Sequence, residues 1–141
     1  MATLIDTNVL VYRVDHRFPE KRDRATDVLR AAIASGDARV PYQAIVEFVA
    51  ATTRLRSGQP PMLERTAALR EAEELLACYD VIWPDEAMVR LALQGAALYQ
   101  LSWFDALIWA HAERAGCELI LSEDFESGRR YGRVRALNPF L

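Results

Sequence analysis

An aspartate stands in the middle of the apolar stretch that opens the chain. Asp6 is preceded by Leu4 and Ile5 and followed, after two polar residues, by Val9 and Leu10. A carboxylate that enters a protein interior must be paired, hydrogen-bonded or bound to a cation, because otherwise its pKa rises and it becomes neutral. Two explanations fit this position. Asp6 caps a helix that follows a short strand, or it binds a cation together with other acids of the chain.

Two further aspartates occur at comparable places. Asp124 follows the apolar run 118–122, which we expect to be a strand, and Asp105 lies in the first turn of the helix before it. Ser102 and Asp105 have the spacing of a capping box, which by itself accounts for an acid there. Strand ends in a parallel sheet meet at one edge, however, so Asp6, Asp105 and Asp124 can reach the same place. Such a cluster needs a counter-charge, and ligands that are all oxygen favour Mg²⁺ or Mn²⁺ over Zn²⁺.

Glu47 is a fourth candidate on a predicted helix. At about 100° per residue it lies about 160° from the apolar stripe of that helix, between the small side chains of Ala44 and Ala51. An isolated helical Glu is usually solvated. The alternative is that the two alanines leave room for Glu47 to reach a cleft.

The composition is that of an ordinary globular protein, with 52% hydrophobic and 26% charged residues in 141. This length suits one domain over residues 1–141. Cys78 and Cys117 form neither a disulfide framework nor a zinc motif. Charges interrupt every long apolar stretch and no signal segment is visible, so we expect a cytoplasmic protein without a membrane span.

The net charge of −3 argues at first against a nucleic-acid partner. The numbers of basic and acidic residues are more informative than the net charge. The chain has 17 Lys and Arg residues against 20 Asp and Glu residues, and Lys21 is the only lysine. If four acids bind metal, the remaining 16 face 17 cations, most of them arginines with the fork that suits phosphate. A high share of arginine can equally reflect genome composition.

Short apolar runs alternate with segments of helical periodicity. We expect strands at residues 3–5, 39–40, 79–83 and 118–122 and a final edge strand at 133–137. Helices are expected from about Asn8, at 19–35, from Pro41 to Ser57, at 63–78, after Asp85 and after Ser102. This order predicts an α/β fold: a three-layer α/β/α sandwich with a mostly parallel central sheet of four to five strands.

Four segments together resemble the PIN-domain ribonuclease family, and in particular the VapC-type toxins of bacterial toxin–antitoxin pairs. They are Ile5 to Leu10, Glu47 in its helix, Ser102 to Ile108, and Leu121 to Phe125. The resemblance covers essentially the whole chain. It implies a single PIN-like domain and a hydrolase that cleaves RNA with one or two Mg²⁺ or Mn²⁺ ions. It also implies an antitoxin partner and a homodimer.

The resemblance further implies a role for individual residues. The acids that match the metal site of the family are Asp6, Glu47, Asp105 and Asp124, with Glu123 as the alternative to Asp124. Supporting polar groups would come from Thr7, Asn8, Ser102 and Ser122.

The basic segment near the end of the chain has two interpretations. Arg129 and Arg130, with Arg133 and Arg135, can form a charged strand edge that deters pairing with other chains. They can instead contact phosphates of RNA or the acidic tail of an antitoxin.

Three other functions compete with a toxin. A phosphatase with an aspartyl nucleophile lacks support, because Asn8 stands where a second acid is needed and no lysine follows Lys21. A housekeeping PIN-domain nuclease of RNA processing and a non-catalytic domain that binds metal or protein both remain alternatives.

Overall fold

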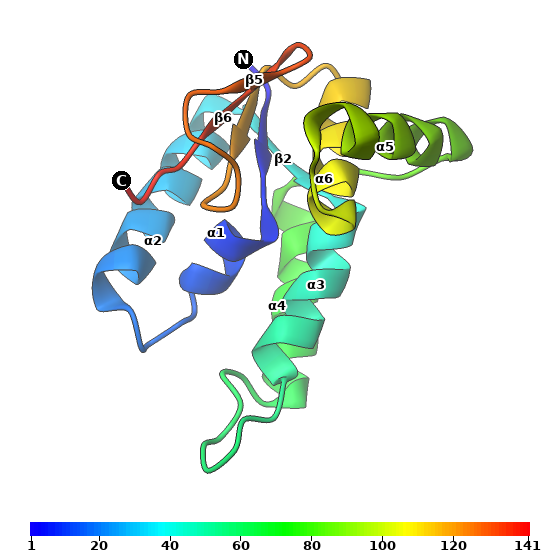
Figure 1. The fold of residues 1–141 in the computed structure, drawn as a ribbon. Helices are drawn as coiled ribbons and strands as arrows, with labels where there is room; N and C mark the ends of the chain where they lie inside the picture. Colours follow the sequence, from blue (N-terminus) through cyan, green and yellow to red (C-terminus); the bar gives the residue numbers. More distant parts are fainter.

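The computed structural model describes residues 1–141 and contains six strands and six helices (Figure 1). The strands are β1 (Thr3–Ile5), β2 (Ala38–Pro41), β3 (Asp80–Ile82), β4 (Leu119–Leu121), β5 (Arg130–Tyr131) and β6 (Val134–Leu137). The helices are α1 (Thr7–Tyr12), α2 (Pro19–Ser35), α3 (Tyr42–Thr53), α4 (Arg65–Cys78), α5 (Glu86–Tyr99) and α6 (Trp103–Arg114).

All six strands form one sheet in the order β3-β2-β1-β4-β6-β5, and every pair except β5 with β6 is parallel. The mostly parallel sheet that we predicted is therefore confirmed. The first strand lies in the middle, with β2 on one side and β4 on the other. Strand order reverses between β1 and β4, which is where α/β sheets bind their ligands.

Helices cover both faces of the sheet. Alternate residues of a strand point to opposite faces, and in β1 Leu4 packs with α5 and α6 whereas Ile5 packs with α1 to α4. The same alternation divides Ile120 from Leu121 in β4. The predicted three-layer sandwich is thus confirmed, and the hairpin of α3 and α4 extends beyond the sheet (Figure 1).

The sheet has one strand more than we expected. The predicted edge strand 133–137 is β6, which lies inside the sheet between β4 and β5. The two-residue strand β5 forms the edge because the chain reverses at Gly132, whose φ of 63° is left-handed. Two residues show too little alternation to be recognised as a strand.

Helix α3 differs from the prediction at both ends. Pro41 is not its first residue but the last of β2, with an extended ψ of 146°. The helix ends at Thr53 rather than Ser57, because Arg54 is extended with a ψ of 129°. Just before this end, the hydroxyls of Thr52 and Thr53 donate to the carbonyls of Phe48 and Val49, one turn earlier in the helix.

Helices α5 and α6 pack closely over the second face of the sheet. Gly95 permits this contact, since a Cβ there would lie 2.3 Å from Cζ3 of the buried Trp109. The predicted apolar stripe of α5 is only partly buried. Met88 and Ala92 enter the core, but Val89 and Leu93 are exposed. No helix of the chain has the length and apolar character needed to cross a membrane.

Candidate active site

Asp6 and the loop after β4 meet at the reversal of strand order. The register pairs Ile5 with Leu121, and the backbone N–H of Asp6 donates to the carbonyl of Leu121 over 3.0 Å. The next residues, Asp6 and Ser122, are therefore neighbours. The hydroxyl of Ser122 donates to Oδ2 of Asp6 over 2.6 Å and accepts the N–H of Asp124 over 3.0 Å. One serine thus links the two carboxylates.

Asn8, in the first turn of α1, is hydrogen-bonded to the loop after β4. Its amide nitrogen donates to Oγ of Ser122 and to Oδ2 of Asp124, each over 3.1 Å. Its oxygen accepts the N–H of Glu123 over 3.3 Å. The predicted supporting roles of Asn8 and Ser122 therefore have a geometric basis.

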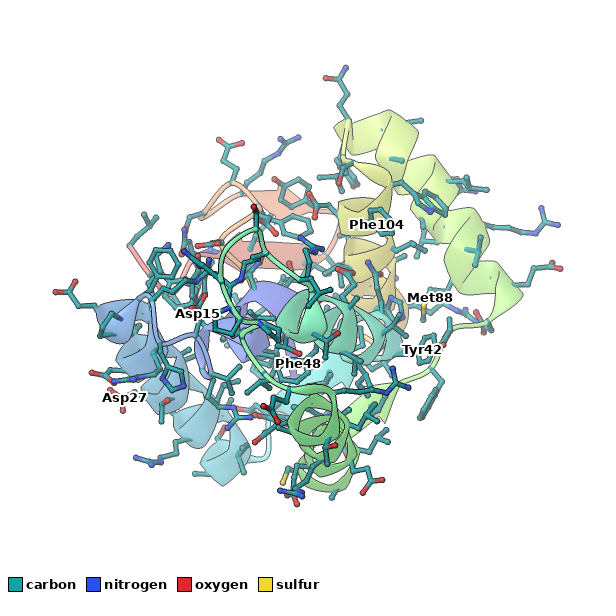
Figure 2. The ribbon with its side chains drawn as sticks, turned by 90° about the horizontal axis from the view of Figure 1, so that it is seen from below. Asp15, Asp27, Tyr42, Phe48, Met88 and Phe104 are labelled. Atoms are coloured by element: carbon teal, nitrogen blue, oxygen red, sulfur yellow. The ribbon has the colours of Figure 1, made fainter.

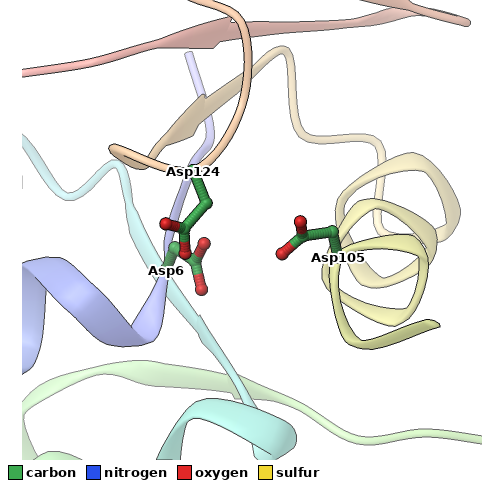
Figure 3. A group of neighbouring side chains, drawn as sticks. All are labelled: Asp6, Asp105 and Asp124. Atoms are coloured by element: carbon green, nitrogen blue, oxygen red, sulfur yellow. The ribbon is translucent and has the colours of Figure 1, made fainter. Parts of the chain in front are cut away.

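Asp105 approaches from the opposite layer. The N-terminal turn of α6 lies at this edge of the sheet, and the carboxylate of Asp105 points toward Asp6 and Asp124 (Figure 3). One oxygen from each of the three carboxylates lies within 4.8 Å of the other two. A single divalent cation can be held by oxygens arranged in this way.

Helix capping, the local explanation for Asp6 and for the Ser102–Asp105 pair, is also partly true. Asp6 is the N-cap of α1 and accepts the N–H of Thr7 over 2.6 Å. Ser102 caps α6 by accepting the N–H of Asp105 over 3.2 Å. That bond uses the backbone of Asp105, so its carboxylate stays available to the cluster. Thr7 is buried beside Asp6, and its hydroxyl oxygen has no hydrogen-bond partner.

The electrostatics of the cluster favour proton or cation binding. Burial raises the pKa of Asp6 to about 7, against the hydrogen bonds from Ser122 and Thr7, and the charges of Asp124 and Asp105 raise it further. Burial also raises the pKa of Asp105, and the charge of Asp124 adds to this. A cation at this place would replace the proton and stabilise the ionised carboxylates.

Glu47 lies beside the three aspartates but outside their closest group. It is half-buried on α3, where Nε2 of Gln43 donates to its carboxylate over 2.6 Å. Burial raises the pKa of Glu47, and the charges of Asp105 and Asp124 raise it further. Glu47 lines a cleft of about 310 Å³ together with Asp124, so it reaches a cleft rather than open solvent.

Glu123 is directed away from the three aspartates. Oε1 accepts the hydroxyl of Tyr12 over 2.8 Å, and Oε2 accepts the ammonium of Lys21 over 3.1 Å. Both carboxylate oxygens are therefore occupied, which favours Asp124 over Glu123 as the last acid of the cluster.

Two residues that sequence reasoning missed hold these groups in place. Gln43 donates to Glu47 and also to the carbonyl of Phe104 over 3.0 Å, which ties α3 to the first turn of α6. Its position one helical turn before Glu47 is the signal that could have identified it. Lys21 anchors the loop after β4 through Glu123.

The predicted basic contacts lie farther from the cluster. Arg130 belongs to β5, and two strands, β6 and β4, separate it from β1. Arg129 pairs with Glu126 over 3.5 Å, and its guanidinium lies 4.6 Å from the ring centroid of Tyr131. Both arginines are exposed, and a contact with RNA stays a prediction for them.

Comparisons with known proteins support the fold and place the chain in a family. A family model described as the PIN domain matches residues 3–132. A search of curated proteins found no match.

Solved structures of similar fold come from several bacteria. One is VapBC2 from Rickettsia felis, bound to a DNA fragment from the VapBC2 promoter. It has a TM-score of 0.71 at 12% identity, and the match covers 96% of this chain and 97% of the other. DNA-bound VapBC from Salmonella typhimurium has a TM-score of 0.70 at 13% identity, and the match covers 96% of each chain. FitAcB from Neisseria gonorrhoeae has a TM-score of 0.64 at 19% identity, and the match covers 98% of each chain. At these identities the likeness concerns the fold, and it extends over nearly the whole of each chain. With a family model that matches all but the ends, the chain belongs to the PIN-domain family.

Proposed function

We propose that this chain is a metal-dependent endoribonuclease and the toxin of a toxin–antitoxin module. The observation that carries the proposal is the convergence of Asp6, Asp105 and Asp124 within 4.8 Å at the reversal of strand order. Asp124 is exposed and lines, together with Glu47, a cleft that a nucleic acid strand can enter from solvent.

The residues of the cluster fit a hard divalent cation. All donors are carboxylate oxygens, with no His or Cys among them, which suits Mg²⁺ or Mn²⁺. Asp6, Asp105 and Asp124 would hold one ion, and Glu47 would assist from α3 or help to hold a second. When bound, such an ion polarises a scissile phosphate and activates water for in-line attack.

The protein groups then have separate tasks. Ser122 and Asn8 fix the angle between Asp6 and Asp124 through the hydrogen bonds described above. Gln43 holds Glu47 toward the cleft while it ties α3 to α6. No side chain is needed as a nucleophile.

Asp124 and Glu123 provide a matched test, because they are adjacent acids with different surroundings. We expect the wild type to cleave RNA in Mg²⁺ or Mn²⁺ and not in EDTA. Asp124→Asn should lose at least about 100-fold in rate, the scale of losing one charged group at a reaction centre. Glu123→Gln should retain cleavage within about threefold and lose about 1 kcal/mol of stability with its partly exposed ion pair. Equal loss in both variants would refute this division of roles.

The toxin role rests on family membership and on a second surface. Between α2 and α4 lies a groove of about 530 Å³ with Leu29, Ile33 and Leu75 in it, lined also by charges of both signs that include Arg30, Arg70, Glu71 and Glu74. This surface suits an amphipathic segment of an antitoxin that carries charges of both signs. Such a protein would act in the cytoplasm.

Expression in a bacterial host distinguishes a toxin from a housekeeping nuclease. We expect the wild type to arrest growth, Asp124→Asn to be tolerated, and a small protein encoded next to the chain to relieve the arrest. Normal growth with abundant, active wild type would favour the housekeeping alternative. Absence of RNA cleavage with either metal would favour the non-catalytic alternative.

A homodimer is the further partner that we propose. Several apolar side chains are exposed: Tyr42 and Trp83, whose ring centroids are 5.5 Å apart, and Val89 and Leu93 on α5. Tyr42, Met88 and Phe104 are labelled in Figure 2. An exposed apolar patch on a soluble domain marks an interface, and sedimentation of Leu93→Glu as a monomer beside a dimeric wild type would support it.

A further inference from the structure

The loop between α1 and α2 contains an arginine that a buried carboxylate holds in place. Asp15 is 2% exposed and lies between these two helices (Figure 2). It accepts Nε and Nη2 of Arg17 over 2.9 and 2.8 Å and the backbone N–H of Arg17 over 3.1 Å. The side chain of Arg17 is itself 49% exposed. A buried acid thus orients a cation that is half exposed to solvent.

The guanidinium still has its outer edge free. Of the five N–H groups of an arginine side chain, Asp15 takes two, one on Nε and one on Nη2. The remaining donors, on Nη1 and Nη2, form a second fork that matches two oxygens of one phosphate. The ring of Phe18, whose centroid is 5.3 Å from the guanidinium carbon, limits rotation on another side. The fork is therefore fixed before any ligand arrives.

The side chain of Arg17 borders the cleft that Glu47 and Asp124 also line. Arg17 and Tyr12 line the same 310 Å³ space as Asn8, Glu47 and Asp124. Arg17 is the one cationic side chain among the residues that line it. An acidic cleft repels the phosphates of an RNA strand beyond the one that a metal binds, so a fixed cation at its wall is the feature that a polyanion needs.

We propose that Arg17 binds a backbone phosphate of the RNA that flanks the phosphate to be cleaved. This inference rests on the proposed function and adds a substrate-binding residue that neither the sequence motifs nor the acid cluster indicate. Arg17 binds substrate without touching the reacting atoms. Its loss therefore raises KM and leaves kcat and metal affinity close to those of the wild type.

The test uses a short RNA oligonucleotide that the wild type cleaves, with Arg17→Gln, Arg17→Lys and the control Arg22→Gln. Arg22 lies on α2, pairs with Asp23 and does not line the cleft. Arg17→Gln is expected to raise KM about 10- to 100-fold, the scale of a charged hydrogen-bonded contact, with kcat within about threefold. The dependence of log KM on log salt should weaken by about 0.7, the value for one phosphate of a single strand. Arg22→Gln should change neither value.

Single neutral methylphosphonate linkages then identify the phosphate. The wild type should lose affinity at one linkage beside the cleavage site, and Arg17→Gln should lose nothing further there, because the contact is already absent. Arg17→Lys keeps a charge and a donor for Asp15 but lacks the fork. The KM of Arg17→Lys should fall between those of the wild type and Arg17→Gln. Arg17→Lys replaces Arg17→Gln in the test if Arg17→Gln does not fold.

The outcomes separate this inference from the proposed function. A wild type that cleaves no RNA overturns the proposed function. A wild type that cleaves while Arg17→Gln keeps its KM, or keeps the full methylphosphonate penalty at every linkage, overturns the role of Arg17 alone. Weaker binding of an antitoxin with unchanged RNA kinetics would also overturn it, and would assign the fork to a protein carboxylate.

Discussion

Asp105→Asn is expected to abolish metal-dependent cleavage of RNA while the fold stays intact. The carboxylate contributes one of the three oxygens that lie within 4.8 Å of one another. Asparagine keeps its shape but not its charge. The bond that caps α6 uses the backbone N–H of Asp105 and survives the substitution. We expect kcat/KM to fall at least about 100-fold, or roughly 2.7 kcal/mol in the barrier, with the free energy of unfolding within about 1 kcal/mol of the wild type.

A capping aspartate far from the cluster is the control for this prediction. Asp85 caps α5 by accepting the N–H of Met88 over 2.8 Å and pairs with Arg114. Asp85→Ala should lose about 1 kcal/mol of stability or somewhat more and keep its cleavage rate. If Asp105→Asn instead loses stability and retains cleavage, then Asp105 is a structural acid only.

Asp6→Asn should change how stability depends on pH in the metal-free protein. The pKa of Asp6 is raised to about 7 in the fold from an ordinary 3.8. The folded state therefore binds a proton that the unfolded state has released between these two values. Its contribution to stability is complete below about pH 4 and is lost as the pH rises to about 7 and beyond. The whole change is at most about 4 kcal/mol by linkage, and the raised pKa values of Glu47 and Asp105 act in the same direction.

Urea unfolding between pH 5 and 8.5 in EDTA measures this effect. The wild type should become steadily less stable, and Asp6→Asn should show a flatter profile and exceed the wild type near pH 8. Mn²⁺ should restore the wild type at pH 8, by about 2.7 kcal/mol at 100 times its dissociation constant, and should not affect the variant. Parallel profiles for Asp6→Asn, the wild type and the exposed control Asp27→Asn would show that the ionisation of Asp6 does not contribute to the pH dependence of stability.

Local features of the fold could be predicted from the sequence because their causes are local. Pro19 and Gly36 delimit α2, and Asp85 caps α5, since the backbone preferences of these residues act within a few positions. The apolar strands β1 and β4 were predicted for the same reason. The end of α3 could not be predicted, because no glycine or proline marks Arg54, where the backbone becomes extended.

The candidate site was only partly predictable. The acids were identified by their positions after strands and in a helix turn, but their convergence depends on the pairing of β1 with β4, whose residues are more than 100 positions apart. The same pairing places Ser122 against Asp6. The engagement of Glu123 by Lys21 depends on how α2 packs against the sheet, which periodicity does not encode. The fork of Arg17 is held locally by Asp15, but the burial of Asp15 and the place of Arg17 at the cleft depend on tertiary packing. The exposure of Leu93 shows that a regular apolar stripe does not reveal which half enters the core.

Binding of Mn²⁺ is the most direct test of the central claim, that Asp6, Asp105 and Asp124 share a metal ion. Titration calorimetry at pH 7.5 should show binding to the wild type with release of protons, because Asp6 must ionise. Asp105→Asn should bind at least about 10-fold more weakly, since even outer partners of metal sites contribute this much. Equally tight binding by the wild type and Asp105→Asn, or no binding by the wild type, would contradict the account.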